Sequence, residues 1–279
     1  MNTTKYDNIG QLEAKAADIR REILAMVHEA KSGHPGGSLS ATDIVTALYF
    51  HVMNIDPERP RWEDRDRFIL SKGHACPVLY SALAEKGYFG MSEISTFRKF
   101  HSILQGHPDM NKTPGVDMSS GSLGNGLSAG LGMALAGKWK RKNYKVYVML
   151  GDGELSEGIV WEAAMAASHY KLDNLVAIVD GNGLQITGRV EDVLDSSPLA
   201  DKWRAFGWAL VEIDGHDMGA ILDAFEQVRR AARPTVILAK TVKGKGVSFM
   251  ENNADWHGRA PSDAEYATAM LELGYGRTG

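Results

Sequence analysis

The sequence, 279 residues long, predicts an α/β protein in which helices cover both faces of a doubly wound, mostly parallel sheet. Short apolar runs alternate with segments of helical spacing after residue 140. Helical spacing dominates the residues before it. No internal repeat and no linker-like composition divides the chain, so we expect one domain over residues 1–279, with residues 1–10 flexible.

The first half of the chain contains mainly helices. Apolar residues recur at helical spacing up to residue 30, and the glycines and proline of Lys31-Ser32-Gly33-His34-Pro35-Gly36-Gly37 end that pattern. We expect a second helix to start near Ser40, capped by Ser40 or Thr42, and a later helix to be capped by Ser92. The expected elements are helices over 11–31, about 40–49, 77–86 and 92–100, a strand over 67–70, and a long loop over 104–121.

The second half alternates between strands and helices. Over residues 121–142, apolar residues at helical spacing predict a helix, and the glycines within it predict that a neighbouring element packs closely against its backbone. A polar, glycine-containing loop follows the last strand. The expected elements are strands over 145–150, 174–180, 208–213 and 234–239, helices over 156–170, 198–206, 217–231 and 262–273, and a loop over 240–260.

Composition narrows the class of protein. Apolar residues make up 44% of the chain and charged residues 24%, which is ordinary for a globular protein. A net charge of -4 and the lack of a long apolar run predict neither a nucleic acid nor a membrane as partner. Cys76 is the single cysteine, so an internal disulfide is excluded and a cytoplasmic location is expected.

Polar residues end two apolar runs that should be neighbouring strands. Asp152 and Gly153 follow the strand over 145–150, and Asn182 follows the strand over 174–180. Parallel neighbours lie about 4.8 Å apart, so Asp152 and Asn182 should leave the sheet close together. Their oxygens suit a hard divalent cation, and Gly153 and the next helix N-terminus suit a diphosphate. From these residues alone, an ordinary strand-to-helix turn and a metal site both stay open.

Six ordered blocks resemble motifs of the transketolases, a family of thiamine-diphosphate enzymes. The resemblance covers about residues 11–273, and Ser122 departs from it because most members carry proline there. The blocks are residues 31–36, residues 71–75, Gly106-His107-Pro108, residues 120–126, Gly151-Asp152-Gly153 with Asn182, and residues 243–247 with His257 and Gly258.

The resemblance implies a thiamine-diphosphate-binding fold and assigns roles to individual residues. Asp152, Asn182 and the carbonyl of Leu184 would bind Mg²⁺ or Ca²⁺. Gly153, His74 and His257 would lie at the diphosphate, and Gly121, Ser122 and Leu123 at the aminopyrimidine. His34, His107 and His257 would face the substrate, where histidine suits proton transfer near neutral pH. Glu157 would reach toward the partner's site and its cofactor, and the alternative is that it only favours the dipole of the helix that it precedes. The loop over 240–260 would be an active-site loop.

The resemblance also implies a partner. Ordinary transketolases continue with a pyrimidine-binding domain and a C-terminal domain, and this chain resembles the first domain alone. We therefore expect the N-terminal subunit of a split transketolase, paired with a second chain that carries the other two domains in an α2β2 heterotetramer. The expected reaction moves a two-carbon glycolaldehyde unit from a ketose phosphate to an aldose.

Other functions remain open at this point. The enzyme could be specialised for a branched or sulfonated sugar phosphate, could resemble a deoxyxylulose-phosphate synthase, or could be a subunit without catalytic function. A dinucleotide-binding oxidoreductase is disfavoured, because the glycines after Gly124 do not form the required Gly-x-Gly-x-x-Gly pattern behind a strand.

Overall fold

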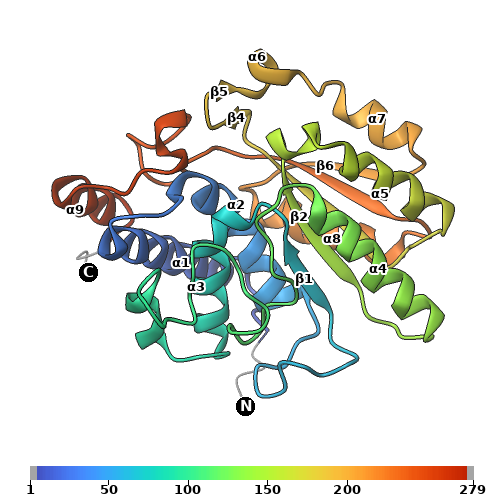
Figure 1. Cartoon of the computed structure of the whole chain (residues 1–279), viewed down its shortest axis with the longest axis horizontal. Helices are drawn as coiled ribbons and strands as arrows, with labels where there is room; N and C mark the ends of the chain where they lie inside the picture. The colour runs from blue at the N-terminus through green and yellow to red at the C-terminus, as the bar shows by residue number, and fades with distance from the viewer. Residues whose placement is uncertain (1–4, 275–279) are drawn as a thin grey trace.

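A five-stranded parallel sheet forms the centre of the molecule (Figure 1). The computed structural model describes residues 5–274. The strand order is β1-β2-β3-β7-β6, and every neighbouring pair is parallel. The strands are β1 (Arg67–Leu70), β2 (Val146–Gly151), β3 (Leu175–Gly181), β6 (Ala209–Asp214) and β7 (Thr235–Lys240), and β4 (Leu184–Gln185) pairs with β5 (Gly188–Arg189) in a separate hairpin.

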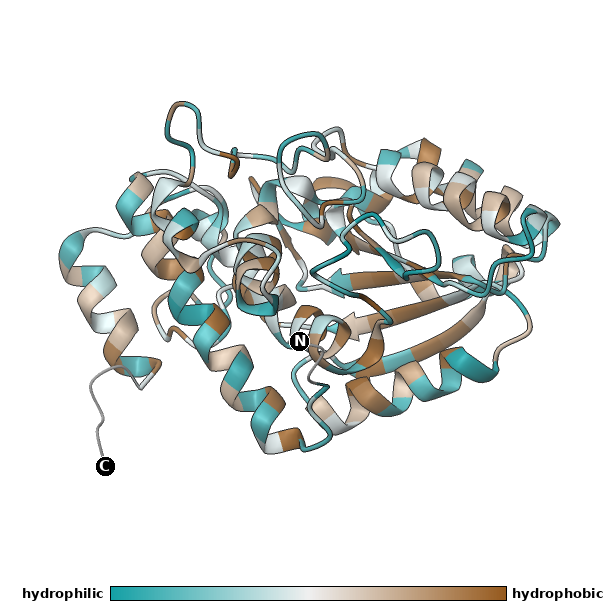
Figure 2. Ribbon diagram, turned by 90° about the horizontal axis from the view of Figure 1, so that it is seen from below, coloured by the Kyte–Doolittle hydropathy of each residue, from teal (hydrophilic) through white to brown (hydrophobic). Residues whose placement is uncertain are grey.

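Helices cover both faces of the sheet, which confirms the predicted fold class (Figures 1 and 2). One face packs against a core formed with α1, α2, α3 and α8, and α9 packs against α1 at the margin of that core. The other face packs against α4, α5 and α7. The helices are α1 (Ile9–Ala30), α2 (Pro35–Ala47), α3 (Cys76–Lys86), α4 (Asn125–Trp139), α5 (Gly158–His169), α6 (Val190–Leu194), α7 (Leu199–Ala205), α8 (Met218–Arg230) and α9 (Asp263–Glu272).

Strand β2 illustrates why the strands read as continuous apolar runs. Tyr147 and Met149 belong to the core beneath α1, α2 and α8, whereas Val146, Val148 and Leu150 belong to the core beneath α4 and α5. Alternate side chains point to opposite faces, and both faces are buried, so no position calls for a polar residue. Figure 2 shows these largely hydrophobic strands between the layers of helices.

Four strands deliver polar residues to one edge of the sheet. Lys72 follows β1, Asp152 follows β2, Asp180 lies near the end of β3, and Thr241 follows β7. Gly151 of β2 is paired with Asp180 of β3, so the expected adjacency of these two strands is confirmed. The carboxyl edge of a parallel sheet is where open α/β folds bind their ligands.

Two predicted helix starts were wrong. Helix α2 begins at Pro35 rather than near Ser40, and neither Ser40 nor Thr42 caps it. Proline suits the first helical turn, and burial of all thirteen α2 residues outweighs the low helix propensity of its glycines. Residues 92–100 do not form a helix capped by Ser92; a 3-10 turn spans Met91–Thr96, and Arg98 and His101 have positive φ angles.

The hairpin β4–β5 and helix α6 were not predicted. Each strand of the hairpin has only two residues, which are too few to show the alternation of apolar and polar residues that indicates a strand. The expectation for residues 1–10 falls partly outside the described chain, and Ile9 already belongs to α1. Within residues 5–274, no helix is long and apolar enough to span a membrane.

Candidate cofactor-binding site

A cavity of about 330 Å³ lies at the carboxyl edge of the sheet, where β1, β2, β3 and β7 end. We call it the sheet-edge cavity. Seven of the residues predicted from the sequence line it, together with Lys72, Glu154, Gln185 and Lys243, which were not predicted. The seven are His74, Leu123, Asp152, Gly153, Asn182, Leu184 and His257.

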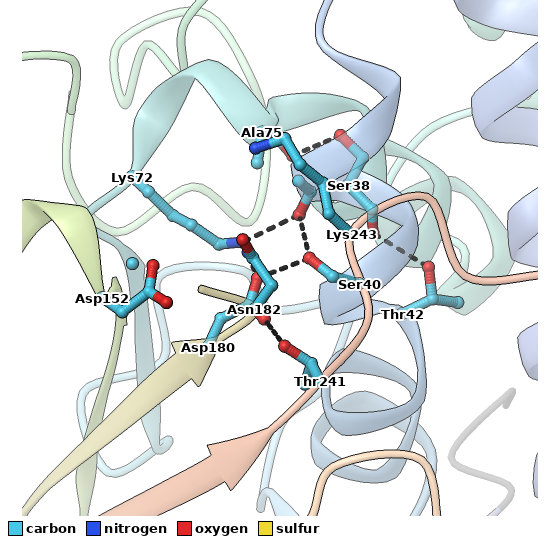
Figure 3. Close-up of polar contacts among 12 residues, drawn as sticks. Ser38, Ser40, Thr42, Lys72, Ala75, Asp152, Asp180, Asn182, Thr241 and Lys243 are labelled. Carbon is cyan, nitrogen blue, oxygen red and sulfur yellow. Dashed lines mark hydrogen bonds and ion pairs between the residues drawn. The ribbon is translucent and has the colours of Figure 1, made fainter. Parts of the chain in front are cut away.

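A buried ion pair forms the floor of the site. The Lys72 ammonium contacts the carboxylate of Asp180, and the two side chains are 3% and 0% exposed. Lys72 Nζ also donates to the Gly37 carbonyl at 2.7 Å, and the hydroxyls of Ser40 and Thr241 donate to Asp180. Burial alone would raise the pKa of Asp180, but Lys72 and the two hydroxyls keep it below its usual value. Figure 3 shows these side chains converging on the end of β3.

Asp152 and Asn182 lie beside this pair with oxygens that a cation could use (Figure 3). The Asp152 carboxylate accepts the backbone N–H groups of Gly153 at 2.8 Å and Gly183 at 2.5 Å. The Asn182 amide oxygen accepts the N–H of Leu184 at 3.1 Å. Burial and the nearby Asp180 raise the pKa of Asp152 to about 6.

This donor set fits a hard divalent cation. It offers a carboxylate, an amide oxygen and a backbone carbonyl, and Mg²⁺ completes such a set with water and phosphate oxygens. A cation would also relieve the buried charge of Asp152, which raises its pKa in the structure. Within residues 5–274, no group of three or more His, Cys, Asp or Glu side chains is suited to hold a metal, so any metal here would rely on amide and carbonyl oxygens.

Glu154 joins the strand end to the glycine-rich loop. Its carboxylate accepts the Ser71 hydroxyl, the Gly124 N–H at 2.7 Å and the Gly151 N–H at 3.0 Å. Burial raises the pKa of Glu154 despite these donors. Gly124 has a φ of 81°, and a Cβ there would lie 2.9 Å from the Cβ of Glu157, so a glycine is required at this contact.

Three histidines from three different segments meet at one side of the cavity. The ring centres of His34 and His74 are 5.2 Å apart, those of His34 and His257 are 5.4 Å apart, and those of His74 and His257 are 5.0 Å apart. Burial, assisted by neighbouring positive charges, lowers the pKa of His34 to about 4, that of His74 to about 2 and that of His257 to about 3. All three rings are therefore neutral at pH 7.

Lys243 links the histidines to the rest of the cavity. Its ammonium lies 3.2 Å from Nδ1 of His257 and 3.4 Å from the carbonyl oxygen of Leu184. Burial and the neighbouring Lys72 lower the pKa of Lys243 to about 8. Lys243 therefore remains mostly charged at pH 7 and adds positive charge to the wall that carries His257.

The other predicted site residues lie outside the cavity lining. The ring of His107 lies near Gly121, where an added Cβ would be 3.1 Å from Cδ2 of the histidine. Ser122 and Glu157 are exposed, and Glu157 directly precedes α5. The structure thus brings His34 next to the cavity histidines. It leaves His107, Ser122 and Glu157 exposed and Gly121 half-buried, all outside the cavity lining.

Sequence reasoning missed several residues of the site. Lys72 lies two residues before His74 and Asp180 two residues before Asn182, but an ion pair between positions 108 residues apart has no local signal. Glu154 directly follows Gly151-Asp152-Gly153, and this position next to the motif was the signal in the sequence that could have identified it as a site residue. Lys243 opens the last motif.

The fold and the sheet-edge cavity define a class of protein, the parallel α/β domains that bind a phosphorylated cofactor at the carboxyl ends of their strands. Here the strand ends provide lysine ammonium groups, carboxylate and amide oxygens, and neutral histidines. Residues 12–278 match the family described as "Transketolase, thiamine diphosphate binding domain". The chain belongs to this family.

Relatives fall into two groups by length. The chain is 44% identical to one of the subunits of the apulose-4-phosphate transketolase of Phocaeicola vulgatus, covering 94% of this chain and 93% of that protein. It is 45% identical to the 6-deoxy-6-sulfo-D-fructose transketolase subunit SqwG of a Clostridium species, covering 94% and 96%. Human transketolase is 43% identical over 89% of this chain, but only 40% of the human protein is covered.

Solved structures show the same relation. The transketolase of Campylobacter jejuni superposes with a TM-score of 0.90 and 34% identity, covering 95% of this chain and 43% of that one. The transketolase of Leishmania mexicana gives a TM-score of 0.89 at 30% identity, covering 94% of this chain and 41% of that one. This chain therefore spans less than half the length of these transketolases.

Proposed function

We propose that this chain is one of the two subunits of a split transketolase, in which it supplies the domain for thiamine diphosphate and metal. The observation that carries the proposal is the match to two proteins named as transketolase subunits, of which 93% and 96% are covered at 44% and 45% identity. A partner chain would supply the pyrimidine-binding and C-terminal domains. An α2β2 heterotetramer is the simplest assembly.

Asp152, Asn182 and the carbonyl of Leu184 would hold Mg²⁺ or Ca²⁺. The support comes from the chemistry of the oxygens and from the buried carboxylate, whose pKa is raised to about 6. Bringing a divalent cation to Asp152 would favour its charged form, so metal affinity should fall when this carboxyl is protonated.

Gly153, His74 and His257 would contact the diphosphate, with Lys243 beside them. Gly153 offers a backbone that a phosphate can approach, and the neutral histidines can donate one hydrogen bond each. Gly121, Ser122 and Leu123 would contact the aminopyrimidine. Leu123 lines the cavity, which supports its place in that set.

His34, His107 and His257 would bind the hydroxyls of the sugar. Being uncharged, His34 and His257 would orient a hydroxyl or stabilise developing negative charge on oxygen without adding a net charge to the site. Glu157, exposed at the start of α5, would contact the partner subunit or its cofactor. The loop over 240–260 would close one side of the site, because it carries both Lys243 and His257.

When bound, thiamine diphosphate supplies an electron sink for breaking the bond beside a ketose carbonyl. The residues of this chain would anchor its diphosphate end, exclude water and position the sugar. The expected reaction transfers a glycolaldehyde unit from a ketose phosphate to an aldose. Relatives named for apulose 4-phosphate and for 6-deoxy-6-sulfo-D-fructose support a branched or sulfonated ketose as the donor.

The test is an assay of glycolaldehyde transfer with thiamine diphosphate and Mg²⁺. The chain alone should be inactive, and adding the partner subunit should produce activity. A parallel mixture with Asp152→Ala should stay inactive, and a donor panel of ordinary, branched and sulfonated ketose phosphates would identify the substrate. Transfer by the purified single chain would refute the two-subunit proposal.

A further inference from the structure

Arg98 lies beside the histidine cluster but outside the sequence motifs. It follows the 3-10 turn Met91–Thr96, and its φ of 60° places the backbone in the left-handed region, which is uncommon for a residue other than glycine. Its Nη1 donates to the hydroxyl of Ser32 at 2.7 Å, and its Nη2 lies 3.5 Å from Nδ1 of His34. An unfavourable backbone conformation persists only where surrounding contacts enforce it.

Gly106 provides the room for this guanidinium. A Cβ added at Gly106 would lie 3.1 Å from Cζ, Nε and Nη2 of Arg98, which is tighter than ordinary van der Waals contact. The guanidinium therefore lies against the Gly106 backbone, and Ser32 fixes its other side. Both neighbours direct Nη2 toward His34.

The chemistry of a guanidinium restricts the state of the imidazole. Arginine stays protonated and has only donors, so Nδ1 of His34 can only accept from it. The single proton of the neutral ring must then sit on Nε2. A second proton on Nδ1 would remove the acceptor and place two positive charges side by side.

The other groups that face His34 provide no negative charge that would favour a second proton. His74 comes from the turn after β1, His107 from the loop before α4, and Lys243 and His257 from the loop after β7. None of these groups is an acid, and the positive charge of Lys243 opposes a second proton on His34 near neutral pH. The contact between the Lys243 ammonium and Nδ1 of His257 is similar to the contact between the Arg98 guanidinium and Nδ1 of His34.

We propose that Arg98 is a positioning residue for His34: its guanidinium donates to Nδ1, keeps the proton of the neutral ring on Nε2 and, together with burial, opposes a second proton. His34 is then a hydrogen-bond donor to an oxygen of the ligand and not a general base. The role toward a sugar rests on the proposed transketolase function, whereas the protonation state of the ring does not.

The first test measures the ring itself. Long-range ¹H–¹⁵N spectra of the full chain, labelled with ¹⁵N-histidine and assigned with His34→Gln, report which nitrogen of His34 carries the proton and at which pH the second proton binds. Arg98→Gln removes the charge, Gly106→Ala displaces the guanidinium without changing any charge, and Arg98→Lys keeps the charge.

Removing Arg98 should let His34 take its second proton at a pH at least about one unit higher, because a like charge within a few ångströms disfavours protonation by roughly that amount. Gly106→Ala should shift the midpoint in the same direction by less, and Arg98→Lys should stay closer to the unmodified chain. An unchanged midpoint in both Arg98→Gln and Gly106→Ala would overturn the proposal. If Arg98→Gln does not fold, Gly106→Ala decides alone.

The second test uses the chain with its partner subunit. Relative to the unmodified complex, Arg98→Gln should lose more activity at pH 5 than at pH 8, because a His34 pKa raised from about 4 by about one unit makes protonated His34 abundant only near pH 5. Arg98→Lys should recover part of that loss. An equal loss at both pH values would overturn the role of Arg98 through His34. If the spectra change as expected but the unmodified complex transfers no glycolaldehyde, the proposed function fails and the assignment of Arg98 stands.

Discussion

Lys72→Met should destabilise the chain in a way that depends strongly on pH. The substitution keeps the length of the side chain but leaves the carboxylate of Asp180, which is 0% exposed, without its cation. Removing one partner of a buried ion pair usually costs about 3–5 kcal/mol. The remaining donors, Ser40 and Thr241, hydrogen-bond the carboxylate but carry no charge.

The structure sets an upper limit on that cost, because Asp180 can become protonated instead of staying charged. Protonating a carboxyl with an unfolded-state pKa of about 3.9 costs about 1.4 kcal/mol per pH unit above that value. The limit is therefore about 4 kcal/mol at pH 7 and about 1.5 kcal/mol at pH 5.

The sign follows from proton binding. In the unmodified chain the pKa of Asp180 is lowered, so the carboxyl is ionised in both folded and unfolded states between pH 5 and 7 and adds no slope. In Lys72→Met the folded state binds a proton that the unfolded state releases, so stability falls as pH rises. Urea unfolding of the full chain at pH 5, 6 and 7 measures this slope.

The double variant Lys72→Met/Asp180→Asn is the matched control. Asparagine can keep hydrogen bonds with Ser40 and Thr241 but has no charge to neutralise. The double variant should lose only about 1–2 kcal/mol, with no slope between pH 5 and 7. A loss of equal size at pH 5 and pH 7 in the single variant would refute the reasoning, and so would a double variant that is as unstable as the single one at pH 7.

Two further predictions concern the cofactor. Asp152→Ala should abolish metal-dependent binding of thiamine diphosphate in a calorimetric titration while leaving the circular dichroism spectrum unchanged, and an unaltered affinity would contradict the metal site. Affinity for thiamine diphosphate should decline above pH 8, because the pKa of Lys243 is lowered to about 8 and its positive charge is lost there. Lys243→Arg should remove that decline; a parallel decline in both proteins would show that Lys243 is not responsible.

The sequence predicted the fold class because the signals for it are local. Apolar runs of four to seven residues alternate with helical spacing, and right-handed crossovers bring β2 and β3 together, as the register of Gly151 with Asp180 confirms. The same logic placed Asp152 and Asn182 at one edge. It failed at α2, where packing against the core, and not a capping residue, sets the helix start at Pro35.

The sequence therefore determined the layers, the adjacency of β2 and β3, and the motif residues that line the sheet-edge cavity. The tertiary structure alone decided that Lys72 neutralises Asp180, that Glu154 holds Gly124, and that Arg98 reaches His34. These contacts join segments 30 to 108 residues apart. Charge pairing and desolvation depend on which distant segments of the chain lie next to each other in the folded structure. Local periodicity in the sequence carries no information about these neighbours.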